Sequence, residues 1–200
     1  MATPTRDRDR VTEGRPIPDE AYIEPQVPDV RRLAWHLGDL FTSGAVAGIV
    51  AGFVFLLANM AYATTQGKPA LAPFMDISTI FHGTDQPAST TPTVDMLATG
   101  AVVHISLSIA FGIVFALLVG LFASIVRNWL VLGIAGVLYG LALYVVNFQI
   151  LGNTLFEWFT DPRGPNQGFE VFIHAAFGLM LVPFFLGLAH RLSGTEARSY

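Results

Sequence analysis

The fold is decided by residues Leu97 to Ile125, which read LATGAVVHISLSIAFGIVFALLVGLFASI. This stretch has no charged side chain and exceeds the roughly 20 apolar residues that cross the hydrocarbon core of a bilayer. Small or polar residues recur at every fourth position and share one helix face: Gly100, His104, Ser108, Gly112, Ala116 and Gly120. Such a face packs against another helix, so His104 is predicted to point into protein rather than lipid.

The composition of the whole chain also indicates a membrane protein. The sequence is 52% hydrophobic and only 13% charged, whereas a soluble domain carries about a quarter charged residues. The net charge is −4 and no helix carries a basic cluster, so no nucleic-acid partner is expected. The absence of cysteine excludes disulfides and thiolate metal sites.

We expect an all-α membrane protein folded as a four-helix transmembrane bundle. The predicted transmembrane domain covers residues 43–190, with spans at about 43–63, 97–125, 129–152 and 169–190. A further short amphipathic helix, ended by Gly83, is expected on the outer surface and is built on Phe74, Ile77, Ile80 and Phe81.

The chain on either side of this domain is polar. Residues 1–28 are rich in charge and proline and are expected to form a disordered cytoplasmic tail, and residues 191–200 a second cytoplasmic tail. Between the first tail and the first span, the apolar spacing over 29–42 predicts a separate interfacial helix. With the N-terminus inside, only Lys68 and Arg163 of the eleven basic residues fall outside, so both termini are expected in the cytoplasm.

Two motifs each occur twice, which predicts two repeated hairpins. The first and third spans share Gly-x3-Gly-x6-Asn, and the second and fourth spans share an Ala-Phe-Gly motif after Ser108 or His174. Two similar hairpins in the same orientation imply a pseudo-twofold axis along the membrane normal. The glycines expected to support close helix packing are Gly44, Gly48, Gly52, Gly112, Gly136, Gly140 and Gly178.

The few polar groups inside the spans lie at one depth. From a rise of about 1.5 Å per residue, Asn59, His104, Asn147 and His174 fall roughly 6–10 Å inside the outer helix ends, with Ser108 close by. Three interpretations stay open. The residues form interhelical hydrogen bonds, or the two histidines ligate a haem b or a metal, or the layer lines a pocket for a quinone, lipid or small solute.

Enzymatic chemistry has little support in this sequence. Ser108 with His174 lacks the glycine-rich elbow of a nucleophile, so no catalytic residue is predicted. No charged residue lies deep within a span, which leaves out the usual carboxylate of a proton-coupled transporter.

His104-x3-Ser108-x2-Phe111, the glycine-rich third span and Glu170-Val-Phe-Ile-His174 resemble the YagU-like inner-membrane proteins of bacteria. The resemblance covers the four spans. It implies a small multi-span protein of the bacterial inner membrane, adds Glu170 to the candidate site residues and implies no reaction.

We therefore expect a non-enzymatic accessory or scaffolding protein in the lipid bilayer. It is expected to self-associate through the Gly48/Gly52 or Gly136/Gly140 faces, or to join a larger membrane complex. The alternative is a protein that binds a small molecule, a quinone, or haem or metal in the outer polar layer. No cofactor is predicted outside that alternative.

Overall fold

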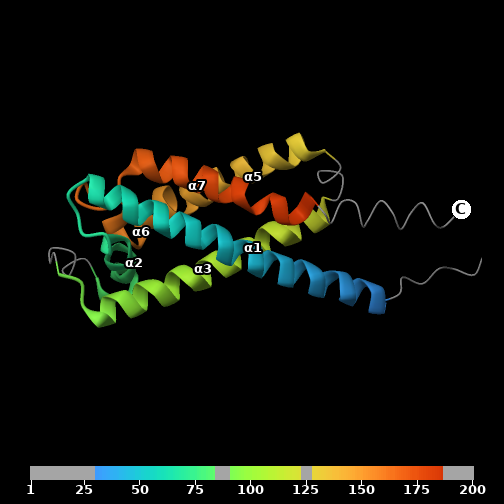
Figure 1. The fold of residues 1–200 in the computed structure, drawn as a ribbon, viewed down its shortest axis with the longest axis horizontal. Coiled ribbons are helices and arrows are strands. Elements are labelled where there is room, and N and C mark those ends of the chain that lie inside the picture. Colours follow the sequence, from blue (N-terminus) through green and yellow to red (C-terminus); the bar gives the residue numbers. More distant parts are fainter. Residues whose placement is uncertain (1–29, 84–90, 123–127, 187–200) are drawn as a thin grey trace, which may run out of the picture.

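A computed structural model describes residues 30–83, 91–122 and 128–186, with the side chains of residues 30–36 excepted. The predicted tails, 1–28 and 191–200, lie outside these ranges. The described chain is helical and has no strand, and its elements are α1 (Val30–Thr65), α2 (Ala72–His82), α3 (Val94–Leu121), α5 (Trp129–Tyr144), the π-helix η1 (Val145–Leu151), α6 (Gly152–Thr154), the 3-10 helix η2 (Glu157–Thr160) and α7 (Gln167–Leu181) (Figure 1).

Four of these helical stretches are long and apolar enough to cross a membrane, which confirms the predicted four-helix fold. They cover Leu37–Thr65, Val94–Leu121, Trp129–Thr154 and Gln167–Leu186. The second span begins three residues earlier than predicted, and its predicted end at 123–125 lies outside the described residues. The last four residues of the predicted fourth span, 187–190, also lie outside them.

Three spans begin at a polar residue that caps the helix. The side chain of Thr93 accepts from Met96 N at 3.3 Å, and that of Asn166 accepts from Phe169 N at 3.0 Å. Asn128 caps α5 in the same way and accepts from the backbone N of Leu130 at 2.9 Å. Each cap satisfies a backbone N–H group that the first helical turn leaves without a partner.

The N-terminal helix differs from the prediction. Residues 30–65 form one continuous helix, so the expected separate interfacial helix over 29–42 is wrong. The two predicted helices adjoin at residues 42 and 43, and no proline lies near this boundary. The Thr42 hydroxyl donates to the Gly38 carbonyl within the helix. Without a breaker the helical hydrogen bonds continue into the span.

The last span bends where proline interrupts it. Helix α7 ends at Leu181, and a short helical turn follows from Pro183 to Leu186. The Val182 N–H donates to the Leu179 carbonyl at 3.2 Å, a tighter turn than the α-helix makes. Proline lacks an N–H, so the α-helical ladder cannot continue through residue 183.

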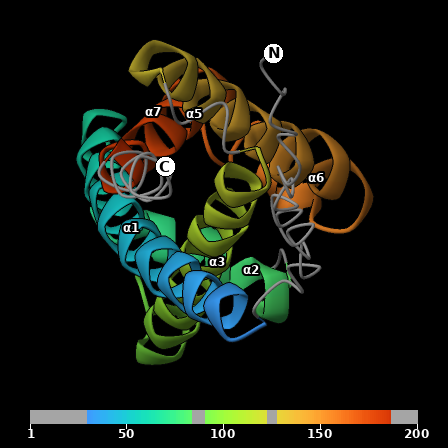
Figure 2. The same cartoon turned by 90° about the vertical axis from the view of Figure 1, so that its right-hand side faces the viewer.

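Glycines bring the helices of each hairpin into backbone contact. A Cβ atom on Gly48 would collide with the Ser108 carbonyl oxygen of α3, and one on Gly140 would collide with the His174 carbonyl oxygen of α7. Figure 2 shows α1 crossing α3 and α5 lying along α7. Gly48 and Gly140 both belong to the predicted repeat motif, and Ser108 and His174 occupy equivalent repeat positions.

All the predicted packing glycines face a helix of the same chain. Gly112 and Gly178 approach the carbonyl oxygens of Gly44 and Gly136, and Gly52 approaches the Ser108 side chain. These faces are already occupied within one protomer, which corrects the expectation that a second copy binds there.

The two hairpins meet in an apolar core and through a hydrogen bond between α5 and α3. The buried core draws on all four spans and contains Ala47, Ala51, Phe115, Ala116, Val119, Leu132, Leu143, Phe177, Leu181, Val182 and Phe185. Beside it, the Tyr139 hydroxyl of α5 donates to the Phe111 carbonyl of α3 at 2.7 Å.

Tyr139→Phe is expected to lower the free energy of unfolding by about 1 kcal/mol, because it removes this bond without changing the apolar ring. Tyr62→Phe is the matched control, since the Tyr62 ring stacks on Phe169 and its hydroxyl has no hydrogen-bond partner in the described chain. Thermal unfolding in detergent measures both variants. Equal melting temperatures for the two would contradict a stabilising role for the Tyr139 hydroxyl.

Helix α2 closes the end of the bundle at which α1 ends and α3 begins, which is the end predicted to face outward (Figure 1). It ends at Gly83, whose φ of 74° suits glycine, as predicted. However, α2 packs against α3 rather than exposing one whole face: Met75, Ser78 and Thr79 are buried, and Gly100 of α3 lies against the Phe74 backbone. The helix therefore forms a wall of the protein interior.

Candidate functional site

A cavity of ≈ 940 Å³ lies between α2 and the outer parts of α1, α3, η1 and α7. Every residue proposed for the polar layer lines it: Asn59, His104, Ser108, Asn147, Glu170 and His174. Most of the other lining side chains are apolar, and several are aromatic. The residues that the sequence placed at one depth thus surround a common space.

His104 connects the two helices of the first hairpin. Its Nε2 lies 2.8 Å from the Gly52 carbonyl oxygen on α1. A carbonyl only accepts hydrogen bonds, so Nε2 carries the hydrogen and donates. In the neutral imidazole this leaves Nδ1 as an acceptor.

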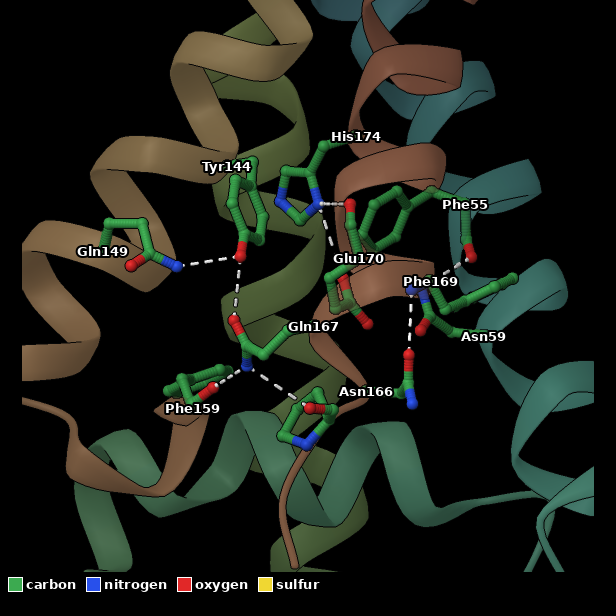
Figure 3. A network of polar contacts seen from close by, with 11 residues as sticks. Phe55, Asn59, Tyr144, Gln149, Phe159, Asn166, Gln167, Phe169, Glu170 and His174 are labelled. Atoms are coloured by element: carbon green, nitrogen blue, oxygen red, sulfur yellow. Dashed lines mark hydrogen bonds and ion pairs between the residues drawn. The ribbon is translucent and has the colours of Figure 1, made fainter. Parts of the chain in front are cut away.

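His174 and Glu170 form a buried pair on α7. The exposed fractions are 6% for His174 and 5% for Glu170. His174 Nδ1 donates to the Glu170 backbone carbonyl at 2.8 Å and lies 3.4 Å from Glu170 Oε2 (Figure 3). Glu170 lines the cavity from the first turn of α7.

The two asparagines do not join the layer into a network. Asn59 Nδ2 donates to the Phe55 carbonyl of its own helix at 3.2 Å (Figure 3). The Asn147 side chain has no hydrogen-bond partner among the described residues, and its backbone oxygen accepts from the N–H of Gly152, which follows η1. Among Asn59, His104, Asn147 and His174, only His104 bonds to another helix.

The π-helix that holds Asn147 is a feature that the sequence analysis missed. Residues 145–151 make i→i+5 hydrogen bonds within the third span, whose predicted range of 129–152 contained no irregularity. Such turns add one residue to a helix and often occur at functional sites. Here the π-helix forms one wall of the cavity, through Asn147, Phe148 and Leu151.

A polar chain holds this wall against α7. Gln149 donates to the Tyr144 hydroxyl at 2.8 Å, and that hydroxyl donates to Gln167 Oε1 at 3.0 Å. Gln167 in turn donates to the Phe159 and Pro165 carbonyls, as Figure 3 shows. The chain joins η1, η2 and the start of α7.

The aromatic ring of Phe55 packs against both candidate histidines. Its centroid lies 5.9 Å from that of His104, in a stacked arrangement, and 5.0 Å from that of His174, edge to face. A haem held between these imidazoles would have to displace this ring. Among the described residues no group of three or more His, Asp or Glu is placed to hold a metal ion. The haem or metal interpretation stays a prediction.

Two further polar residues reach the cavity from α2, Asp76 and His82. Asp76 Oδ1 accepts from Trp158 Nε1 at 2.7 Å, and His82 Nε2 lies 3.2 Å from Asp95 Oδ2. The sequence analysis did not propose them, because an amphipathic helix on the membrane surface would turn its polar side to water. Only the packing of α2 against α3 turns these side chains inward.

Burial raises the pKa of Asp76 from 3.8 to about 6. The Trp158 hydrogen bond and the positive charge of Lys68 act in the opposite direction, and the negative charge of Glu170 raises the pKa further. The Lys68 ammonium does not line the cavity, since it donates to the carbonyls of Arg163 and Gly164 at 2.8 and 2.9 Å. Two carboxylates and three imidazoles line the cavity, with no Lys or Arg among the described lining residues.

The cavity opens sideways past α3. Val102, Ser106 and Leu107 both line it and are exposed on the surface of the protein. At about 1.5 Å per residue they lie roughly 12–20 Å along the span from Val94, well below its outer end. Helix α3 packs extensively on α1 and α2. The described residues of α3 and η1, by contrast, make few contacts with each other.

Comparisons of the chain with protein-family models, with curated proteins and with solved structures give no match, so the site is interpreted from its own geometry.

Proposed function

We propose that this chain is a non-enzymatic protein of the bacterial inner membrane that binds a small lipophilic molecule in its outer cavity. The observation that carries the proposal is the cavity itself, ≈ 940 Å³ of space lined by apolar side chains and a few converging polar groups. Ligand sites of membrane and soluble proteins share this character and fall in a range of about 300–1,000 Å³. The resemblance to YagU-like proteins and the distribution of basic residues support the compartment and the cytoplasmic termini.

The route of entry also favours a lipophilic ligand. The opening beside Val102, Ser106 and Leu107 lies at the depth of the hydrocarbon, where α3 faces lipid. A molecule dissolved in the bilayer reaches the cavity through this opening without crossing the α2 wall. The ligand would then place an apolar body among the phenylalanines and a polar group near Glu170 and His174.

A scaffolding role alone does not account for this space. Protein interiors are close-packed, and an apolar void of this size forfeits packing contacts. The expected accessory role is compatible with ligand binding, because a bound molecule would fill the void and stabilise the bundle.

The proposal predicts saturable quenching of Trp158 by a small lipophilic nitroxide, 4-octyloxy-TEMPO, in liposomes. The experiment uses a variant whose other tryptophans, Trp35 and Trp129, are replaced by phenylalanine. The Trp158 indole is 4% exposed and bonds to Asp76 on the cavity wall, so lipid-dissolved quencher reaches it poorly except from the cavity. The control is a chain that keeps Trp129 and has phenylalanine at the other two tryptophan positions. Trp129 is exposed, so its quenching should rise with quencher concentration without reaching saturation.

A pair of substitutions on α3 identifies the site. Val103 lines the cavity, whereas Ile105 is 52% exposed and does not line it. Val103→Phe should abolish the saturable component, and Ile105→Phe should leave it unchanged. Two results would contradict the proposed function. One is quenching that stays linear in the chain that keeps only Trp158, and the other is an equal loss of the saturable component in both variants.

A further inference from the structure

We propose that the molecule taken up by the cavity is a lipophilic amine, bound as its ammonium ion with the charged head near Asp76, Glu170 and His174. This inference rests on the proposed function and names the ligand class. Three independent features of the cavity support it: its charge, its hydrogen-bonding groups and its aromatic lining.

The first feature is charge. The cavity lining contains the carboxyl groups of Asp76 and Glu170, and no Lys or Arg among its described residues. The nearest basic side chain, Lys68, turns its ammonium toward two loop carbonyls. A positive charge on the ligand would balance carboxylates that burial otherwise leaves poorly solvated.

The second feature is the direction of the hydrogen bonds. His104 and His174 each use one N–H group on a backbone carbonyl, so the second nitrogen of each neutral ring is an acceptor. The Asn59 amide group donates one N–H to Phe55 and keeps its carbonyl oxygen and one N–H, and the Trp158 N–H is used by Asp76. The polar end of the cavity therefore offers mainly lone pairs to a ligand.

This excess of acceptors separates two ligand classes. An ammonium group brings two or three N–H donors and a positive charge, which match carboxylate, imidazole and amide acceptors. A quinone brings only carbonyl acceptors, and among the groups at this end the neutral donors left are Asn147, the second N–H of Asn59 and the serine hydroxyls. The hydrogen-bonding groups favour the amine over the quinone that the sequence left open.

The third feature is the aromatic lining. Phe55, Phe148 and Phe177 line the cavity, and the rings of Phe55 and Phe148 lie 5.0 Å and 5.4 Å from the His174 ring. An ammonium ion near such rings is attracted to their faces, more so when it is desolvated. The same rings offer apolar contact to the body of the ligand.

The test compares two nitroxides of similar shape in the chain that keeps only Trp158. One is 4-octylamino-TEMPO, whose secondary amine is protonated at pH 7.5, and the other is the neutral 4-octyloxy-TEMPO. Each affinity is referred to the concentration of probe dissolved in the lipid, measured separately in protein-free liposomes. We expect the ammonium probe to bind at least about tenfold more tightly than the ether.

Glu170→Gln should remove most of this preference, because it removes the negative charge and keeps the shape of the side chain. Glu157→Gln is the matched control, because that carboxylate is exposed on η2 and does not line the cavity. If Glu170→Gln does not fold, Asp76→Asn is measured in its place, since it keeps the oxygen that accepts from Trp158.

The possible outcomes separate the two proposals. Equal affinities for the two probes, or tighter binding of the ether, would overturn the amine inference while leaving the binding cavity in place. Saturation by neither probe would remove the proposed function as well. A preference for the ammonium probe that survives the carboxyl substitution would also overturn the inference, because the charge would then be recognised elsewhere.

Discussion

Gly140→Ala is expected to lower the free energy of unfolding by about 1–3 kcal/mol, the usual cost of overpacking a filled interface. A Cβ atom at this position would collide with the His174 carbonyl oxygen and lie 3.1 Å from the Ala175 Cα. These are backbone atoms of α7, so the clash is relieved only by moving the helix. Gly140→Leu should prevent the α5–α7 hairpin from closing.

Gly133→Ala on the same helix provides the control. The nearest atom to a Cβ there is the Leu179 Cδ1, at 4.0 Å, which is an ordinary contact. Alanine is more favourable than glycine within a helix by roughly 0.5–1 kcal/mol, so this variant should be as stable as the parent or more stable. Thermal unfolding in detergent should give shifts of opposite sign, and shifts of the same sign would contradict the close crossing.

Asp76→Asn is expected to raise stability at pH 8 and to lose this advantage near pH 4. Burial raises the pKa of Asp76 from its ordinary value of 3.8 to about 6 in the folded protein. Below pH 3.8 the carboxyl is protonated in the folded and unfolded states, and its favourable contribution is fully present. This contribution is lost as the pH rises through 6, because the folded protein must then bury a charge.

The size of the effect follows from the same shift. A rise from 3.8 to about 6, with the attraction of Lys68 already included, corresponds to about 3 kcal/mol. Asparagine has no charge to bury, and its oxygen can still accept from Trp158 Nε1.

Melting temperatures of the parent and of Asp76→Asn between pH 4 and pH 8 measure this dependence. Glu157→Gln neutralises an exposed carboxylate on neighbouring η2 and should change little at any pH. A pH-independent difference between Asp76→Asn and the parent would show that the buried charge is not its cause.

The membrane fold itself was predictable from the sequence. A bilayer accepts only segments whose backbone groups are all bonded within the protein, and a long apolar helix meets this requirement by itself, so length and composition identify four spans. The fourth-position spacing of small residues likewise indicated which faces pack closely. Gly48, Gly112, Gly140 and Gly178 all make backbone contact across a helix pair.

The irregular parts of the helices were not predictable in the same way. The π-helix at Val145–Leu151 leaves the hydropathy of the span unchanged, so it carries no compositional signal. The continuity of α1 through residue 42 depends on a breaker that is absent rather than on any residue that is present. The sequence also did not reveal what packs on each glycine face. The same spacing of glycines suits contact between two helices of one chain and contact between two copies of the protein.

For the candidate site, the sequence by itself determined which polar residues lie at one depth, because helical rise converts position along a span into depth. Only the tertiary structure decided that these residues line an open cavity instead of bonding to one another. It alone brought Asp76 and His82 to the same cavity, because the direction in which α2 turns its polar side depends on its packing against α3. Local spacing records which residues share a face, but contacts between distant segments decide what that face meets.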